Sequence, residues 1–199
     1  HAQRPGNAAV FGGIGDTIGS GAGTNVNLNG GPSAIVVVQT NGSVIVDSGA
    51  KDTLTGGTAA TQIIGVANDT ITTGAGADTV NALAGNQAIT LGNAAGSGTV
   101  YGASGDGFTT GLGSDYVDFI SGHSGTETLA PGSGDDAAAS DTVADFNQTQ
   151  GDRILESGTA ETNTLASAQQ SGNSVVFTLS DGSTITLAGV SSINGSFFS

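Results

Sequence analysis

Cysteine, methionine and tryptophan are absent from this chain of 199 residues, and lysine and arginine together supply only 3. Without cysteine the chain can form no disulfide, no thiolate nucleophile and no cysteine-ligated zinc or iron–sulfur site. No stretch reaches the ~20 consecutive apolar residues of a membrane span, so we expect none. Stability must then come from length, from repetition or from bound metal.

The few basic residues stand against 17 acidic ones, which gives a formal charge of −14. A surface of this sign repels phosphate, so we expect no nucleic-acid partner. Three cations cannot neutralise the carboxylates, and their mutual repulsion loosens a compact state unless other cations bind. Calcium is the natural candidate because it takes carboxylate and carbonyl oxygens as ligands.

Glycine is abundant, at 35 residues, and recurs with a period of nine that the acidic residues follow in step. The pairs that lie nine residues apart include Gly65 and Gly74, Gly102 and Gly111, Asp69 and Asp78, and Asp106 and Asp115. An apolar residue comes two positions after an aspartate at Ile18, Ile71, Val80, Phe108 and Val117. Units this short with one inward side chain cannot fold alone, so the pattern predicts units stacked into a parallel β-solenoid.

The best copies of the repeat are residues 74–80 (GAGADTV) and 111–117 (GLGSDYV), which fit the G-x-G-x-D-x-U part of a calcium-binding nonapeptide. These blocks resemble the repeats-in-toxin (RTX) β-roll of bacterial type I secreted proteins. The resemblance implies a β-roll with degenerate repeats, in which Gly-x-Gly turns with positive φ and aspartate carboxylates bind Ca²⁺. The metal ligands expected on this basis are Asp69, Gly74, Gly76, Asp78, Asp106, Gly111, Gly113, Asp115 and Asp136.

A coil of the family uses two nonapeptides, so its calcium ligands should lie eighteen residues apart. The positions eighteen residues after Asp69, Asp78, Asp106 and Asp115 hold Gln87, Gly96, Ser124 and Ser133, none of which is acidic. We therefore expect a few calcium sites at most. The alternative is that each aspartate is a turn residue that bonds the backbone without metal.

Two segments near the C-terminus extend the resemblance. Residues 141–154 look like the segment that follows the last repeats in serralysin-type C-terminal regions, and residues 174–190 are similar to the hairpin that closes many RTX proteins. The hairpin is also predicted without the family, because apolar and polar residues alternate on both sides of Asp181-Gly182, a type I′ turn signal. We expect Thr164 to cap a short helix over residues 165–170.

Two other segments have two interpretations each. Residues 34–38 and 43–47 form either a second hairpin or two solenoid strands. Residues 195–199 look like the uncleaved export signal of type I substrates, or form a tail whose two phenylalanines dock on the hairpin. The whole sequence predicts an all-β fold, with an RTX-like parallel β-solenoid at 1–130 and a cap and type I secretion region at 131–199. That cap holds the β-hairpin and one short helix.

Catalytic groups are few, because the only histidines are His1 and His123 and no H-E-x-x-H or phosphate-binding lysine motif occurs. We expect no enzyme. The expected function is a secreted, calcium-binding structural or adhesive protein of the bacterial exterior or cell surface. It would self-assemble into a filament or surface layer through its solenoid ends, with cell-surface polysaccharide as another partner.

Two alternatives to this function stay open. The first is a calcium-binding folding and export module of a larger secreted enzyme or adhesin. The second is an ice- or polysaccharide-binding solenoid, which needs threonines in register on successive coils. Thr70, Thr79 and Thr142 each follow an aspartate, but the units between them interrupt that ladder.

Overall fold

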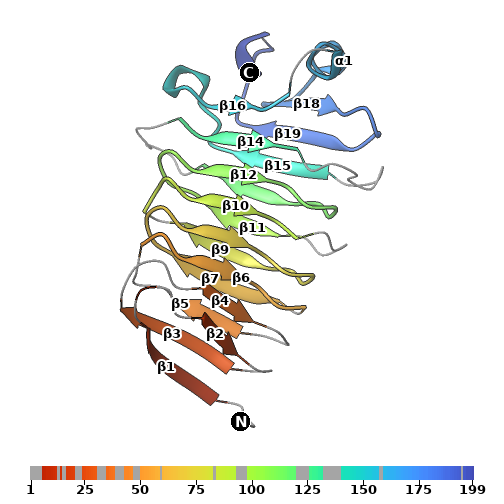
Figure 1. Cartoon of the computed structure of the whole chain (residues 1–199). Helices are drawn as coiled ribbons and strands as arrows, with labels where there is room; N and C mark the ends of the chain where they lie inside the picture. The colour runs from red at the N-terminus through yellow and green to blue at the C-terminus, as the bar shows by residue number, and fades with distance from the viewer. Residues whose placement is uncertain are drawn as a thin grey trace.

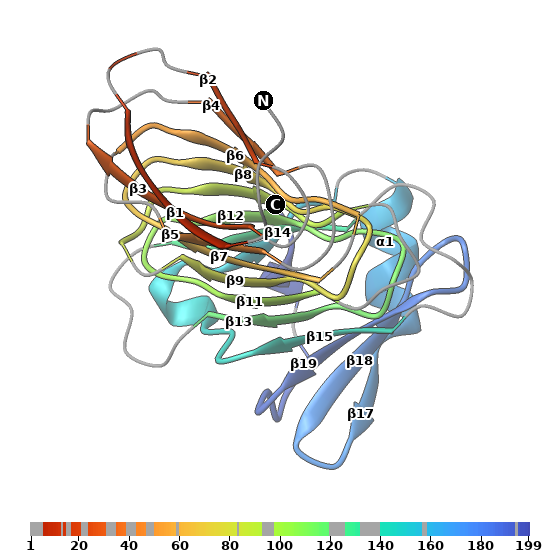
Figure 2. The ribbon, with the colours of Figure 1, turned by 90° about the horizontal axis from the view of Figure 1, so that it is seen from below.

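The computed structural model describes residues 6–12, 14, 17–20, 24–30, 35–38, 43–46, 50–58, 60–82, 84–92, 98–119, 126–131, 140–156, 159–193 and 195–199, with strands β1 to β5 described by their backbone. Two β-sheets face each other and wind into an elongated solenoid, with β1 at one end and α1 at the other (Figure 1). Viewed from below, successive coils are flattened loops, each displaced a little from the one before (Figure 2).

Sheet A has 11 strands and sheet B has 8. Sheet A runs in the order β1 (Gly6–Gly12), β3 (Thr24–Gly30), β5 (Ser43–Val46), β7 (Thr61–Gly65), β9 (Thr79–Ala82), β11 (Thr99–Tyr101), β13 (Tyr116–Asp118), β15 (Ser140–Ala144), β19 (Thr184–Ala188), β18 (Ser174–Thr178) and β17 (Gln169–Ser171). Sheet B runs in the order β16 (Arg153–Ile154), β14 (Thr128–Ala130), β12 (Gly107–Thr109), β10 (Ala88–Thr90), β8 (Thr70–Thr72), β6 (Thr53–Thr55), β4 (Ile35–Val38) and β2 (Thr17–Ser20).

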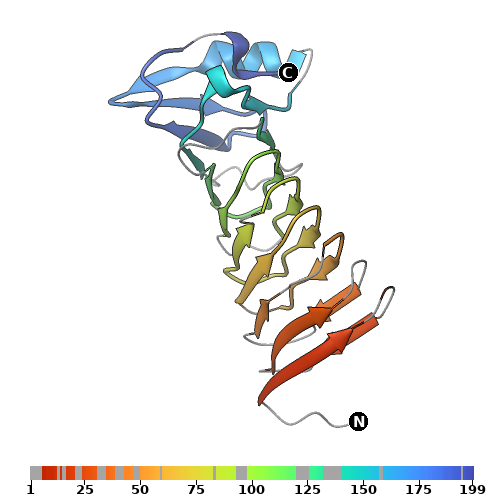
Figure 3. The same cartoon turned by 90° about the vertical axis from the view of Figure 1, so that its left-hand side faces the viewer.

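Successive strands alternate between the sheets, so strands β1 to β16 form eight stacked coils within the described residues (Figure 3). Every strand pair from β1 to β16 is parallel, whereas β17, β18 and β19 pair antiparallel at the C-terminal end. The prediction of a parallel β-solenoid closed by a C-terminal hairpin with one short helix is confirmed. Both sheets continue past residue 130, and the division at 130/131 stays a prediction.

Each strand of the well-packed coils sends an apolar side chain inward at the same register position, because side chains alternate between the two faces of a strand. The inward column of sheet B is Leu54, Ile71, Ile89, Phe108, Leu129 and Ile154, and that of sheet A is Ile63, Val80, Val100, Val117, Val143 and Leu187. All twelve are at most 2% exposed. The predicted inward positions Ile71, Val80, Phe108 and Val117 are therefore confirmed, while the side chain of Ile18 lies outside the described set.

Aromatic rings fill the C-terminal part of the core. The ring pairs are Phe108–Phe119 at 5.4 Å, Phe119–Phe146 at 6.0 Å, Phe146–Phe197 at 5.7 Å, Phe177–Phe197 at 5.9 Å and Phe177–Phe198 at 5.2 Å between centroids. Phe197 is the last residue of the 3₁₀ turn η2 (Gly195–Phe197). Phe197 and Phe198 both contact Phe177, so the predicted docking of the tail on the hairpin is confirmed. An export role for these residues stays a prediction.

The predicted hairpin is correct in its strands and wrong in its turn. Val175 pairs with Leu187 and Phe177 pairs with Ile185, and all four side chains are buried. The N–H of Gly182 donates to the carbonyl of Leu179 at 3.1 Å, and only Gly182 in this loop has a positive φ, of 94°. A type I′ turn needs two such residues, so the connection is a longer loop with one left-handed glycine.

Two local predictions are settled by strand pairing. The helix expected over residues 165–170 is wrong, because α1 spans Thr159–Ser167 and the following residues pair with β18 as β17. Thr164 lies inside α1 and is 2% exposed, so it is not the cap. Residues 35–38 and 43–46 belong to different sheets, so the solenoid-strand interpretation of this segment is correct.

Candidate functional site: the acidic corners and the outer faces

Acidic residues line the two corners at which the chain turns into its strands. The first ladder, ahead of sheet B, is Asp52, Asp69, Gln87, Asp106, Glu127 and Asp152. The second ladder, ahead of sheet A, is Thr61, Asp78, Gly98, Asp115 and Asp141. Members of a ladder are neighbours on successive coils.

Five of these carboxylates share one bonding scheme, in which one oxygen binds the preceding coil and the other binds the aspartate's own turn. The first oxygen, Oδ1, accepts a hydrogen bond from a backbone N–H of the preceding coil. The acceptor and donor residues are Asp69 and Asp52 (2.9 Å), Asp78 and Thr61 (2.7 Å), Asp106 and Gln87 (2.7 Å), Asp115 and Gly98 (2.7 Å), and Asp152 and Glu127 (3.1 Å). The second accepts from the N–H of Val66, Gly74, Ala103, Gly111 and Asn147 at 2.7–2.9 Å. Each carboxylate therefore joins two coils.

The aspartates expected to bind metal are the ones that make these bonds. Asp69, Asp78, Asp106 and Asp115 are 1–3% exposed, and Asp136 lies outside the described residues. Across the described ranges no three acidic or histidine side chains come together as a metal site. Carboxylate oxygens are ligands that calcium prefers. Here, however, the four carboxylates are buried and their oxygens point toward backbone N–H groups. The metal assignment stays a prediction.

The glycines expected to bind metal do not have the positive φ that was predicted. Gly74, Gly76, Gly111 and Gly113 are absent from the glycines with left-handed backbone. Their role is close approach, because a Cβ on Gly74 would lie 1.5 Å from the carbonyl oxygen of Gly57, and one on Gly111 would lie 2.2 Å from that of Gly92. Neighbouring coils touch through bare backbone here, which any side chain would prevent.

Left-handed backbone is found one residue before the first ladder instead. The residues are Lys51 (φ 67°), Asn68 (67°), Asn86 (57°), Gly105 (84°) and Gly151 (107°). Asparagine and glycine are the residues that tolerate this conformation best. The sequence signal for this corner is therefore Asn or Gly directly before an acidic or amide residue, and the nine-residue count did not find it.

Acidic side chains do stack on one another, contrary to the count of eighteen residues. Asp52 and Asp69 are aligned at a separation of 17 residues and Asp115 and Asp141 at 26. Glu127 lies between Asp106 and Asp152 in the first ladder, because Gly107 aligns with Thr128 and Thr128 with Arg153. Loops of unequal length leave the register of the strands intact, so a fixed spacing misses these pairs.

Burial makes the ladders unfavourable for charge. Burial, followed by the charges of Asp152 and Asp106, raises the pKa of Glu127 to about 9, and this side chain is fully buried. Burial also raises the pKa of Asp106 and of Asp141 to about 6, against the opposing effect of the N–H bonds that they accept. Gln87, 2% exposed, has no hydrogen bond to its amide nitrogen or oxygen.

The outer face of sheet B carries two columns of small side chains over five coils. We define the threonine face as the outward positions of β6, β8, β10, β12 and β14. Its first column is Thr53, Thr70, Ala88, Gly107 and Thr128, and its second is Thr55, Thr72, Thr90, Thr109 and Ala130. All ten positions are exposed or half-buried, and seven are threonine. The expected interruption of the ladder through Thr79 and Thr142 is confirmed, because Tyr116 lies between Thr99 and Thr142 on sheet A. Thr70 belongs to sheet B, where the threonine face was not expected.

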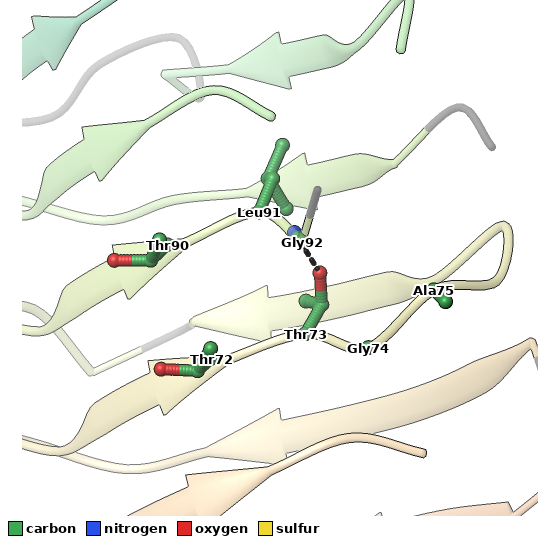
Figure 4. A pocket seen from close by; sticks show the side chains of 7 residues that line it. All are labelled: Thr72, Thr73, Gly74, Ala75, Thr90, Leu91 and Gly92. Carbon is green, nitrogen blue, oxygen red and sulfur yellow. Dashed lines mark hydrogen bonds between the residues drawn. The ribbon is translucent and has the colours of Figure 1, made fainter. Parts of the chain in front are cut away.

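A shallow open hollow of about 390 Å³ lies beside the second column (Figure 4). Residues 72–75 of one coil and 90–92 of the next line it. The hydroxyl of Thr73 accepts a hydrogen bond from the N–H of Gly92 at 2.8 Å across the two coils. The lining holds hydroxyl, methyl and backbone groups and no ionisable side chain, so it offers binding rather than acid–base chemistry.

Fold and ladders together define a parallel β-solenoid of two sheets with buried acidic corners. No family model matches the chain, and no curated protein matches it. Among solved structures it is similar to the crystal structure of extracellular lipase LipA from Serratia marcescens, with 15% identity and a TM-score of 0.38. The match covers 98% of this chain and 38% of that one, so the chain spans well under half of the lipase. Across the described residues, no helix is long and apolar enough to cross a membrane.

Proposed function

We propose that the chain is an extracellular adhesive β-solenoid that attaches through its threonine face to a regular, uncharged solid surface, and that ice is this surface. The observation that carries the proposal is the register of the two columns across five coils. Parallel strands lie about 4.8 Å apart, and alternate residues of one strand about 6.6 Å apart. The threonine face therefore repeats in two directions.

Each threonine offers one hydroxyl and one methyl group, held in few rotamers because the side chain branches at Cβ. Water on such a face is held by the hydroxyls and confined by the methyls at fixed intervals, as it is at the surface of ice. A rigid sheet loses little conformational freedom when it binds, which lowers the cost of association. Rigidity and repetition thus act together.

The absence of charge from these positions supports a neutral partner. None of the ten residues of the threonine face is ionisable, although the chain carries a formal charge of −14. None is aromatic, so the face has no ring on which a pyranose could pack. The same composition therefore favours ice over polysaccharide on this face.

The proposal is tested by ice growth and recrystallisation in the presence of purified protein. We expect the unmodified chain to slow crystal growth and shape the crystals, and Thr90→Tyr to abolish the effect by lifting the face off the lattice. Thr79→Tyr is the matched control, because Thr79 faces outward on sheet A. Unaltered ice growth with the unmodified chain, or equal loss in both variants, would contradict the proposal.

Calcium-coupled folding outside the cell is a second candidate function. The observation that favours it is the stacking of acidic side chains on successive coils, in a chain with 17 acidic and 3 basic residues. Cations that bind only the folded state would stabilise it by mass action. We expect millimolar calcium to raise the urea midpoint relative to chelator, by more than equal magnesium does. Identical midpoints would reject calcium without affecting the threonine face.

Self-assembly through the solenoid ends belongs to the same proposal. β1 and β17 are the edge strands of sheet A, and an edge strand can pair with another chain. Contact between unlike ends would give open filaments. Sedimentation velocity at increasing concentration tests this, and a single monomeric species throughout would exclude assembly.

The alternative of a folding and export module predicts that the chain speeds the folding of a domain fused to its N-terminus.

A further inference from the structure

We propose that the outer face of sheet A carries a binding platform for a neutral polysaccharide, built on Tyr101 and Tyr116. The platform lies on the sheet that does not carry the threonine face. It would give the solenoid a second contact surface, independent of the first.

The two tyrosines are the exception to the way this fold uses aromatic residues. The chain has 2 tyrosines, and each is 37% exposed. The phenylalanines with described side chains are all buried, with exposures of at most 8%. Two amphipathic rings are therefore presented to solvent on one sheet.

The strand register makes the two rings diagonal neighbours. Tyr116 of β13 aligns with Thr99 of β11, and Tyr101 of β11 aligns with Asp118 of β13. One strand spacing and two residues of rise place their Cα atoms about 8 Å apart. Two aromatic side chains at this diagonal spacing can both contact one extended chain laid across the strands.

Polar side chains surround both rings. In register on the neighbouring strands, Tyr101 is flanked by Asn81 and Asp118, and Tyr116 by Thr99 and Thr142. Burial, followed by the charges of Asp118, Tyr101 and Asp145, raises the pKa of the Tyr116 phenol. Carboxylate, amide and hydroxyl groups are the partners that sugar hydroxyls use.

The chemistry of the platform fits a sugar chain and its charge selects a neutral one. A ring face gives apolar area to the C–H side of a pyranose, and the polar tips give direction. Exposed apolar groups with a polar rim are typical of binding surfaces. The formal charge of −14, with Asp118 in register beside Tyr101, repels anionic glycans.

The two tyrosines also report on the platform directly. Because the chain has no tryptophan, its intrinsic fluorescence comes from these two phenols alone. We would titrate the full chain with soluble hydroxyethyl cellulose, glucomannan and laminarin, and run affinity electrophoresis in gels containing each polymer. At least one neutral polymer is expected to change the fluorescence and to retard the chain.

Substitutions distinguish the contribution of each tyrosine ring to binding from that of its hydroxyl. Tyr101→Ala and Tyr116→Ala should each weaken binding about tenfold, because each removes the apolar ring face on which a sugar packs. Tyr101→Phe and Tyr116→Phe keep the ring and should bind within about threefold of the unmodified chain. Thr90→Tyr, on the other sheet, should bind normally.

Several outcomes would overturn the platform. These are the absence of binding to all three polymers, equal loss in the Ala and Phe variants, and retardation by cationic chitosan alone with no difference between variants. The last would indicate general charge attraction. Tyr101→Ala should still bind ice, and Thr90→Tyr should still bind polysaccharide. Failure of one proposal can therefore be distinguished from failure of the other.

Discussion

The backbone N–H of Asp115 donates a hydrogen bond to Oδ1 of Asp141 at 2.9 Å, although 26 residues separate them. Asp115 itself accepts from Gly98 of the coil before and from Gly111 of its own turn. One aspartate thus connects three coils. In this solenoid the acidic residue of the repeat acts as the acceptor that aligns successive coils.

The first prediction concerns that acceptor. Asp115→Ala leaves the N–H groups of Gly98 and Gly111 without their bonds in a buried corner. Each unsatisfied donor costs about 1–3 kcal/mol, so we expect the two together to lower the free energy of unfolding by about 2–6 kcal/mol. Asp118→Asn, on the outer face of the same coil, should change it by less than about 0.5 kcal/mol. Equal effects in urea denaturation would refute the bridging role.

The second prediction concerns pH. The pKa of Glu127 is about 9 in the folded chain and ordinary, near 4.5, when unfolded. The folded state therefore holds a proton that the unfolded state releases, and stability is greatest below pH 4.5 and falls as the pH rises toward 9. Asp106 and Asp141, with pKa about 6, act in the same direction up to that pH. Urea midpoints at pH 4.5, 7 and 9 should fall in this order.

Glu127→Gln isolates this group. The variant keeps the shape and removes the ionisable proton, so at pH 7 it should exceed the unmodified chain in stability by about 1–3 kcal/mol. Near pH 4 the two should be similar. A constant difference between them at every pH would show that burial of Glu127 does not set the pH dependence.

The third prediction concerns the amide in the first ladder. Gln87 stands where aspartates stand on the coils before and after it, and its buried amide has no hydrogen bond. The shorter Gln87→Asn side chain can place its oxygen as Asp106 places its own, toward the preceding coil. We expect a gain of about 1 kcal/mol in thermal unfolding. Gln62→Asn, exposed on sheet A, should be neutral, and a loss at Gln87 would be the contrary result.

The fourth prediction concerns the stacking of glycines. Gly111→Ala puts a Cβ 2.2 Å from the carbonyl oxygen of Gly92, so neighbouring coils must separate. We expect a loss of about 1–3 kcal/mol or more, as for overpacking elsewhere. Gly107→Ala is the matched control, because its nearest neighbour is the Thr128 hydroxyl at 3.4 Å. Comparable Tm values for the two variants would contradict the close contact.

A good part of the fold could be predicted from the sequence. A nine-residue period with one apolar position commits each strand to a single inward side chain, and Ile71, Val80, Phe108 and Val117 are buried as predicted. The alternation in residues 174–188 likewise determines a hairpin with one buried face. These features are local, because alternation and turn chemistry act within a few residues.

The partners across coils were decided only by the tertiary structure. Loops of different lengths join strands whose hydrogen bonds fix the register, so Asp115 meets Asp141, 26 positions on. The direction of each carboxylate depends on the N–H groups of the neighbouring coil, which the sequence does not place. The same register aligns Thr55, Thr72, Thr90 and Thr109 into one column. Sequence determined which residues face in and out, and coil stacking determined which of them meet.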